Sequence, residues 1–505
     1  MTDLAIPARG AGILLACSSL PSPYGFGCFG EDARRWLRFL KRAGQKYWQI
    51  LPLGVTGWGD SPYQSFSAFA ISPYYIDLDA LAARGLVSQE AISGGFWGRS
   101  QDKVNYSALY KNRGRVLSQA AEAFFQSESA RADSAPFAEF CARHQSWLDD
   151  YALFMALKSR HSGAPWLEWE DIYKFRDDKA LRRFSAKNEK LVMYYRFEQY
   201  TAYEQWLSLR EEARSLGVSI IGDMPIYVAL DSADVWSHPE LFELDGARRP
   251  IRVAGCPPDP FSASGQLWGN PLYRWDRHRE TGFEWWLSRL KESFAIYDTL
   301  RIDHFRGLES YYAINAGESD ARNGVWVKGP DRAFIDAVRA ASGGLSIIAE
   351  DLGYLSAEVK ALLEYSGYPG MKVLQFAFDS RESGDYMPHN YERNCVVYTG
   401  THDNTTSAQW FKSARQEDVS LALEYLGARS AKNGHLLLVR AALASVANLA
   451  VIPLQDYLGL DGRARMNTPS TLGTNWQWRV RREMLTDGLS ADIAKMTELY
   501  GRAPA

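Results

Sequence analysis

Several short apolar runs along the chain stop abruptly at charged or polar residues. The clearest covers 296–302, is broken only by Asp298 and Arg301, and is followed by Asp-His-Phe-Arg at 303–306. This pattern is typical of a buried barrel strand whose carboxyl end opens into a site. Three more runs share it, ending at Asp223, at Glu350-Asp351 and at His402-Asp403-Asn404. If all four runs are strands of one sheet, their acids converge at one face.

Most of these runs alternate with segments of helical periodicity, such as 31–43, 283–294 and 434–447. The alternation predicts an α/β fold, a (β/α)8 TIM barrel. A doubly wound open sheet is the alternative, but it favours a glycine-rich phosphate loop after the first strand, and Ser-Ser-Leu-Pro at 18–21 is not one. The eight expected strands are 13–17, 47–51, 219–223, 299–303, 346–350, 373–376, 396–399 and 449–452.

The spacing of the expected strands predicts one catalytic barrel, 1–505, with two insertions. Segment 73–200 has mostly helical patterns and is expected to form an inserted helical subdomain. Segment 229–279 is rich in Pro, Gly and Trp and is expected to be an inserted substrate-binding loop region. About fifty residues follow the last expected strand, which is short for a C-terminal β-sandwich domain.

Bulk composition narrows the class of protein. The net charge of -3 gives no sign of a basic face for nucleic acid. The five cysteines form no Cys-x-x-Cys pair, and the first residues lack a signal pattern, so we expect a cytoplasmic protein. The most apolar stretch, 436–454, is interrupted by Arg440, Asn448 and Pro453, which argues against a membrane span. The sequence does not indicate an oligomeric state.

Three carboxylates, Asp303, Glu350 and Asp403, end three different expected strands. A single such acid is equally well explained as a helix cap, but three beside Arg, His or Asn favour a site. Paired acids suit glycosidic cleavage, in which one attacks as an anion and another donates a proton. Arg301, two residues before Asp303, is placed to hold it ionised, and an apolar aromatic pocket would raise the pKa of Glu350.

His304 and His402 leave a metal-dependent hydrolase open as an alternative, because they flank these acids. Such a barrel usually carries His-x-His on its first strand, and segment 13–17 has no histidine. Hydrogen bonding to sugar hydroxyls fits the two histidines better. We therefore expect neither a metal nor an organic cofactor.

Two aromatic segments are candidates for contact with sugar rings. The run 255–271 is stiffened by prolines and offers Phe261 and Trp268, so it is a candidate binding loop. The run 58–65 follows the second expected strand and offers Tyr63. The run 255–271 is also explained as an ordinary surface loop.

In its motifs the chain resembles the 4-alpha-glucanotransferases known as amylomaltase or disproportionating enzyme, of the alpha-amylase clan. The resemblance rests on Asp-Ser-Pro-Tyr-Gln at 60–64, Gly-Asp-Met-Pro-Ile-Tyr-Val at 222–228, Gly-Gln-Leu-Trp-Gly-Asn-Pro at 265–271, Arg-Ile-Asp-His-Phe-Arg at 301–306, Ala-Glu-Asp-Leu-Gly at 349–353, Thr-His-Asp-Asn at 401–404 and Arg-Met-Asn-Thr-Pro at 465–469.

The resemblance implies Asp303 as the nucleophile, Glu350 as the acid/base and Asp403 as a third acid that grips the sugar. It further implies substrate contacts at Tyr63, Asp223, Trp268, Asn270, Arg301, His304, His402 and Asn475. One departure is Pro260, where the family usually has Tyr, and this affects the acceptor loop rather than the chemistry. Trp58 and Tyr106 are candidates for a second glucan site.

Three functions compete on this basis. The leading one is a retaining transferase that moves a segment of a maltodextrin or starch-type glucan to the 4-hydroxyl of another sugar. The second is an α-1,4-glucan hydrolase of the same clan, which composition alone does not separate from a transferase. The third is a non-catalytic glucan-binding protein, which needs the aromatic residues but not three acids with an arginine and two histidines.

Overall fold

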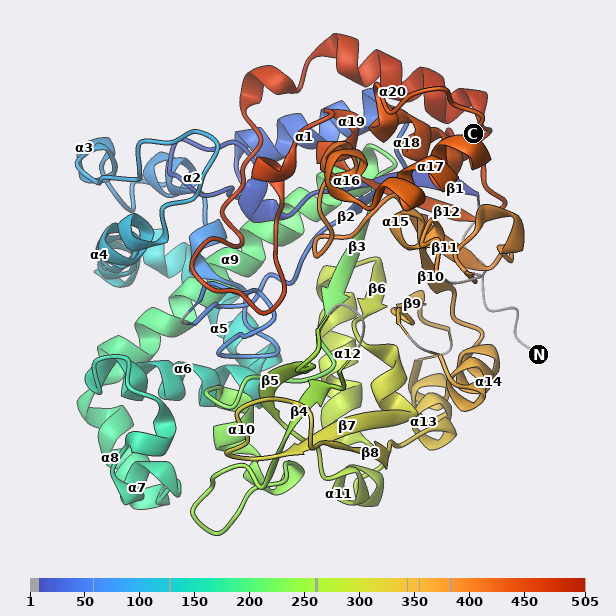
Figure 1. The fold of residues 1–505 in the computed structure, drawn as a ribbon. Coiled ribbons are helices and arrows are strands. Elements are labelled where there is room, and N and C mark those ends of the chain that lie inside the picture. The colour runs from blue at the N-terminus through green and yellow to red at the C-terminus, as the bar shows by residue number, and fades with distance from the viewer. Residues whose placement is uncertain are drawn as a thin grey trace.

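A computed structural model describes residues 9–57, 59–126, 129–258, 262–342, 344–353, 355–381 and 384–504. Eight parallel strands form one sheet in the order β10-β11-β12-β1-β2-β3-β6-β9. The sheet curves into a nearly closed barrel (Figure 1), and Ala349 N, at the end of β9, donates to Pro369 O just before β10. The strands are β1 (Gly10–Leu14), β2 (Tyr47–Gln49), β3 (Ser219–Met224), β6 (Thr299–Ile302), β9 (Ile347–Ala349), β10 (Gly370–Val373), β11 (Cys395–Tyr398) and β12 (Leu449–Pro453).

The predicted barrel is confirmed, although two strands lie elsewhere than expected. The strand expected at 373–376 is wrong, because β10 ends at Val373 and the next residues form the short helix α15 (Leu374–Ala377). Apolar periodicity does not separate a buried strand from a buried helical turn of this length. The first strand lies three residues early, where Gly12 is required because a Cβ there would lie 2.7 Å from Tyr47 Cβ.

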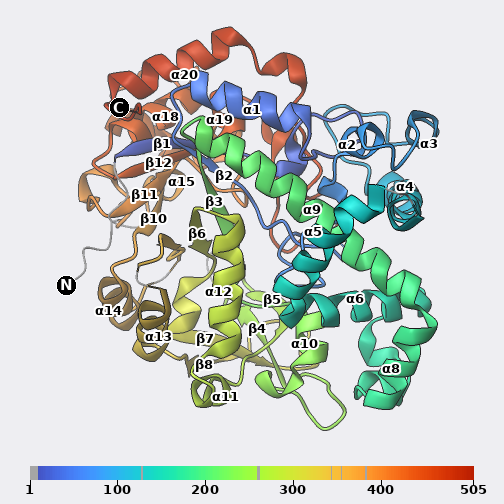
Figure 2. The ribbon, with the colours of Figure 1, turned by 180° about the vertical axis from the view of Figure 1, so that it is seen from behind.

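Helices cover the outside of the barrel, as both ribbon views show (Figures 1 and 2). Helices α1 and α20 lie side by side along one side of it, although they come from opposite ends of the chain. The helices around the strands are α1 (Glu31–Arg42), α9 (Glu189–Ser215), α12 (Glu284–Ile296), α13 (Arg332–Ser342), α14 (Ala357–Ser366), α16 (Ser407–Ser413), α17 (Gln416–Tyr425), α18 (Gly434–Ala444), α19 (Leu454–Tyr457) and α20 (Asp487–Leu499). No helix in the described part of the chain combines the length and the apolar character needed to cross a membrane.

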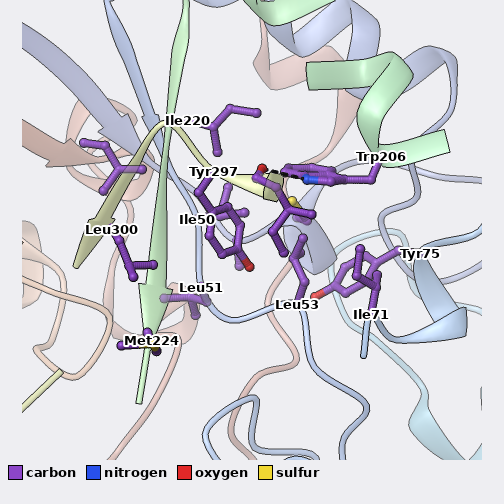
Figure 3. Close-up of a cluster of buried hydrophobic side chains, with 14 of the residues drawn as sticks. Ile50, Leu51, Leu53, Ile71, Tyr75, Trp206, Ile220, Met224, Tyr297 and Leu300 are labelled. Atoms are coloured by element: carbon purple, nitrogen blue, oxygen red, sulfur yellow. Dashed lines mark hydrogen bonds between the residues drawn. The ribbon is translucent and has the colours of Figure 1, made fainter. Parts of the chain in front are cut away.

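The long helix α9 is anchored to the barrel by aromatic packing under β3. Trp206 donates its indole N–H to Ile296 O at 2.9 Å, and Tyr297 lies beside it (Figure 3). The Tyr297 ring occupies the space that a side chain at 222 would need, because a Cβ on Gly222 would lie 2.2 Å from it. Glycine before Asp223 therefore lets β3 pack on this ring and present its acid at the strand end.

Between β2 and α9 the chain forms a group of helices on one side of the barrel (Figure 1). The chain breaks between two helices of this group at His144, whose ring pairs with Glu292 at 2.9 Å. That contact ties the helical group to α12 of the barrel. The helices are α2 (Leu78–Ala83), α3 (Gln89–Ser93), α4 (Tyr106–Gln126), α5 (Ser129–Arg143), α6 (Gln145–Arg160), α7 (Asp171–Lys174) and α8 (Asp178–Lys187).

Glu198, on α9, makes the stability of the protein depend on pH. Burial raises the pKa of Glu198 from 4.5 to about 8, and its side chain accepts a hydrogen bond from Tyr194. Between these two values the unfolded chain loses a proton that the folded chain keeps, so stability falls as pH rises. We expect Glu198→Gln to raise the free energy of unfolding by about 3–5 kcal/mol at pH 8.

The measurement is urea unfolding of both proteins at pH 4.5 and pH 8, with almost no difference expected at the lower pH. Glu204→Gln is the matched control, because Glu204 lies on the same helix but is exposed. A gain for Glu198→Gln that is equal at both pH values would contradict the assignment.

A second, antiparallel sheet was not predicted. Its order is β5-β4-β7-β8, with β4 (Arg252–Cys256), β5 (Gln266–Pro271), β7 (Ser310–Asn315) and β8 (Val325–Lys328). Two of its strands fall in the segment expected to be a loop, and a bulge between Val253 and Gly255 disrupts the alternation that would have revealed them. Two short helices flank these strands, α10 (Ala233–Ser237) and α11 (Trp275–Glu280). The sheet carries Trp268 on β5.

Candidate active site

Arg301 joins two acids at the carboxyl ends of neighbouring strands. The register places Arg301 of β6 directly beside Asp223 of β3. Its guanidinium donates to both oxygens of Asp223, at 2.9 and 2.8 Å, and Nη2 also donates to Asp303 Oδ1 at 2.9 Å. Tyr63 completes the group by donating its hydroxyl to Asp223 Oδ2 at 2.6 Å. These four predicted residues therefore form one polar network, in which Asp223 and Arg301 are buried and Tyr63 and Asp303 are partly exposed.

Glu350 lies at the end of β9, next to the turn that carries Asp303. Ile302 pairs with Ala349 across β6 and β9, so the next residue of each strand leaves the sheet on the same side. Glu350 Oε2 accepts from His304 N at 2.6 Å and Oε1 accepts from Leu352 N at 2.9 Å. His304 has a left-handed backbone, with φ 53°, a strained conformation that turns its N–H toward Glu350.

Asp403 and His402 come from the loop after β11. The His402 ring stacks on Tyr63, with centroids 5.1 Å apart and planes at 16°. Asp403 Oδ1 accepts from Asn467 Nδ2 at 2.6 Å. Trp476 lies against both rings, 5.8 Å from Tyr63 and 5.9 Å from His402. The Tyr63 contact links this loop to the network around Asp223.

Trp268 and Asn270, both on β5, have different surroundings. The Trp268 ring meets His304 edge-on, with centroids 4.8 Å apart, and is only partly buried. Asn270 is buried, donates to Val228 O at 2.9 Å and accepts from Gln64 at 3.0 Å. The structure therefore brings Trp268 to the acids, whereas the Asn270 amide is used to hold β5 against the chain that follows β3.

Burial shifts the pKa of both acids proposed for the chemistry, Asp303 and Glu350. It raises the pKa of Asp303 well above its usual range; Arg301 opposes this, and Asp223, Glu350 and Asp403 reinforce it. The contact by which Arg301 was expected to keep Asp303 ionised is present, but burial and the neighbouring acids outweigh it. Burial also raises the pKa of Glu350, in the direction the sequence predicts.

Both histidines are neutral near pH 7. Burial lowers the pKa of His304 to about 3, with a further contribution from Arg306. Burial also lowers the pKa of His402. Neutral imidazoles can donate and accept hydrogen bonds, which suits contact with hydroxyl groups. Within the described ranges no three His, Cys, Asp or Glu side chains are grouped as a metal site.

A family model described as 4-alpha-glucanotransferase, glycoside hydrolase family 77, matches residues 15–486. The chain belongs to this family. A 4-alpha-glucanotransferase from Thermus thermophilus is 46% identical over 98% of this chain and 99% of its own length. One from Clostridium butyricum is 44% identical over 96% of this chain and 99% of its own length.

Solved structures agree with membership of the 4-alpha-glucanotransferase family. The amylomaltase from Streptococcus agalactiae, solved in complex with acarbose, superposes with a TM-score of 0.95 at 38% identity, covering 98% of this chain and all of that one. The amylomaltase from Corynebacterium glutamicum has a TM-score of 0.78 at 20% identity, covering 97% of this chain and 75% of that one, which shows the same fold.

Other residues that the family resemblance singles out lie near the site or outside the described chain. The Asn475 side-chain amide is hydrogen-bonded to Thr468 and Thr471. It therefore shapes the loop before Trp476 and makes no hydrogen bond to the acids. Tyr106, on α4, donates to Trp476 O at 2.8 Å. Trp58 and Pro260 lie outside the described residues, as does Phe261.

Sequence reasoning missed three residues of this 4-alpha-glucanotransferase site. Asn467 holds the Asp403 carboxylate, Arg465 donates to Asp403 O at 2.6 Å, and Trp476 packs on Tyr63 and His402. All three come after the last barrel strand, where no strand end marks them. The motif Arg-Met-Asn-Thr-Pro at 465–469 was the available signal for the first two.

Proposed function

We propose that this enzyme is a retaining 4-alpha-glucanotransferase that moves a segment of an α-1,4-glucan to the 4-hydroxyl of another glucan or of glucose. The observation that carries the proposal is the network in which Arg301 binds Asp223 and Asp303 while Glu350 lies beside the same turn. Membership of the 4-alpha-glucanotransferase family supports the same reaction. The acarbose complex of the S. agalactiae amylomaltase supports a glucan substrate.

The reacting state has Asp303 ionised against Arg301 and the proton of the two acids on Glu350. In the first step, Asp303 attacks the anomeric carbon and the glycosidic C–O bond breaks. Protonated Glu350 gives its proton to the departing 4-oxygen, so the leaving chain carries a hydroxyl. The pKa of Glu350 is raised by burial, which favours the protonated form that this step needs. The product of this step is a glycosyl ester on Asp303.

In the second step, the acceptor's 4-hydroxyl attacks the glycosyl ester and loses its proton to Glu350. Two displacements at the same carbon restore the α configuration. Asp403 and His402 lie on one loop and supply an acceptor and a neutral imidazole for sugar hydroxyls. Asp223 and Arg301 fix the orientation of the nucleophile.

Transfer dominates over hydrolysis only if a sugar acceptor is held in place better than water. Well-oriented neighbours reach effective molarities on the order of 10⁵–10⁸ M, which is enough to outcompete water. Trp268, which is partly buried beside His304, offers a ring on which an acceptor can be held. The hydrolase alternative needs no such acceptor platform.

The test is the product distribution from maltotriose. A transferase cuts one bond for each bond it makes, so we expect glucose and a ladder of longer maltodextrins with almost no rise in reducing ends. Chromatography combined with a reducing-end assay measures both. Reducing ends that rise in step with glucose, without longer chains, would establish the hydrolase, and no turnover would leave the binding protein.

Replacing Trp268 separates a sugar platform from a structural role. Because Trp268 is partly buried, we expect Trp268→Ala to lower the transfer rate about 3–10-fold, in line with the 0.5–1.5 kcal/mol of an aromatic contact. The melting temperature should stay nearly unchanged. Trp275→Ala is the control, because Trp275 is buried and its loss should cost about 3–5 kcal/mol of stability. Similar melting losses in both variants would assign Trp268 to the core.

The proposal also covers the domain organisation and the cellular compartment. The barrel would form one catalytic domain, with 73–200 and 229–279 as its insertions. The five cysteines lie in the described part of the chain and form no disulfide there, which supports a reducing compartment such as the cytoplasm.

A further inference from the structure

One buried carboxylate closes the loop that carries His402 and Asp403. The loop runs from Thr399, after β11, to Ser407, the first residue of α16. Thr399 Oγ1 and Ser407 Oγ donate to Asp456 Oδ2 at 2.5 and 2.6 Å. Ser407 N donates to Asp456 Oδ1 at 2.7 Å. Both ends of the loop are therefore fixed to the same side chain.

Asp456 belongs to the neighbouring barrel unit. It lies in α19, directly after β12, and β12 pairs with β11 in parallel. Its exposed fraction is 1%, so a sugar in the site does not reach it. No ion pair joins Asp456 to any described residue, and its two oxygens are satisfied by the loop's own three donors.

The interior of the loop is also tied by hydrogen bonds. Asn404 Oδ1 accepts from both Thr401 N and Thr401 Oγ1 at 2.9 Å. Gln375 Nε2 donates to Thr405 O at 2.9 Å. Between these ties lies the pair His402 and Asp403, which Arg465 and Asn467 hold from the segment after β12.

We infer that Asp456 is a positioning residue for the reaction: it fixes the loop ends so that Asp403 and His402 meet the sugar at the right place. The inference rests on the proposed glucan transfer, in which Asp403 contacts substrate. Catalytic constellations lose about 10²-fold in rate for misplacements near 1 Å, so a buried support of this kind has a measurable effect. In metal sites, mutating the outer residue that orients a ligating side chain typically lowers metal affinity or activity 10–100-fold, and we expect a loss on this scale here.

The first variant is Asp456→Asn, which keeps the shape of the side chain but turns one acceptor oxygen into an N–H donor. With the amide nitrogen in the Oδ2 position, the Thr399 and Ser407 hydroxyls must turn from donors into acceptors, and the hydrogen bonds that hold the two loop ends are weakened. We expect kcat for maltotriose disproportionation to fall about 10–100-fold, with a smaller change in KM. The reason is that the contacts of Asp403 and His402 with the sugar should be stronger in the transition state than in the bound substrate.

Asp418→Asn is the matched control. Asp418 is also buried and accepts from the backbone N and the Oγ of one serine, Ser380, at 3.0 and 2.7 Å. It lies on α17 and takes no part in the site. We expect its kcat to stay within about twofold of wild type. Should Asp456→Asn fail to fold, Thr399→Val, which removes one donor only, serves in its place, with a smaller loss in kcat of at least about threefold.

A double-mutant cycle with Asp403→Asn separates positioning from a general loss of stability. If Asp456 acts through the loop tip, adding Asp456→Asn to Asp403→Asn should lower kcat by less than about threefold more. A full further 10–100-fold loss would overturn the inference, as would a folded Asp456→Asn enzyme within twofold of wild type. Failure of the proposed function is distinct, because it shows in the wild-type products before any variant is assayed.

Discussion

Asp303→Asn should abolish both transfer and hydrolysis of maltotriose, with a fall in rate on the order of 10⁴-fold or more. The amide is a poor nucleophile, so the glycosyl ester does not form. A 10⁴-fold loss corresponds to about 5.5 kcal/mol of lost transition-state stabilisation. The fold should survive, because Asn keeps the oxygen that accepts from Arg301 Nη2 at 2.9 Å.

The same variant should be more stable than wild type at neutral pH. The pKa of Asp303 is raised by burial, so its ionisation in the folded state costs stability, increasingly as pH rises above the usual carboxyl range. A neutral amide removes that cost, as is common where a site is built at the expense of stability. Thermal unfolding of both proteins at pH 5 and pH 8 measures it, with the larger gain expected at pH 8.

A small external nucleophile identifies the role of Asp303 directly. In Asp303→Gly, azide can occupy the space of the missing carboxylate and attack an α-maltosyl fluoride, because fluoride leaves without protonation. A single displacement inverts the configuration, so the expected product is the β-maltosyl azide. Full activity on maltotriose in Asp303→Asn, or an α-azide from Asp303→Gly, would show that another group is the nucleophile.

The parts of the site that the sequence could predict lie at the ends of barrel strands. An apolar run that ends in Arg301-Ile302-Asp303-His304 carries both signals at once, burial and sudden charge, and the structure places these residues together. Glu350 could be predicted for the same reason. The pairing of Arg301 with Asp223 follows from the parallel register of β3 and β6, which the barrel prediction implied.

What could not be predicted comes from contacts between distant segments without a strand end to mark them. Asn467 reaches Asp403 from 64 positions away in the chain. The sheet of β4, β5, β7 and β8 combines two segments separated by α11, α12 and β6, and its short strands carry glycines and a bulge. The direction of the pKa shift of Asp303 also depends on how many acids meet around it, which only the folded arrangement determines.

Glu350 gives a prediction of a different form, because its loss should depend on the leaving group. Glu350→Ala should lower the rate on maltotriose by about 10²–10⁴-fold, the usual contribution of a general acid. Alanine is preferred to glutamine, because the Glu350 oxygens accept from His304 N and Leu352 N at 2.6 and 2.9 Å. A glutamine amide would face one of these N–H groups with a second donor and distort the turn.

With α-maltosyl fluoride as donor, the first step in Glu350→Ala should be nearly as fast as in wild type, because fluoride needs no proton. The second step lacks its base, so a glycosyl ester on Asp303 should accumulate, and mass spectrometry of the quenched enzyme would detect it. Added azide needs no deprotonation and should release the ester as the α-maltosyl azide, the opposite anomer from that of Asp303→Gly. If the rate fell equally on maltotriose and on the fluoride, Glu350 would not be the acid/base, and its role would be to hold the turn at His304.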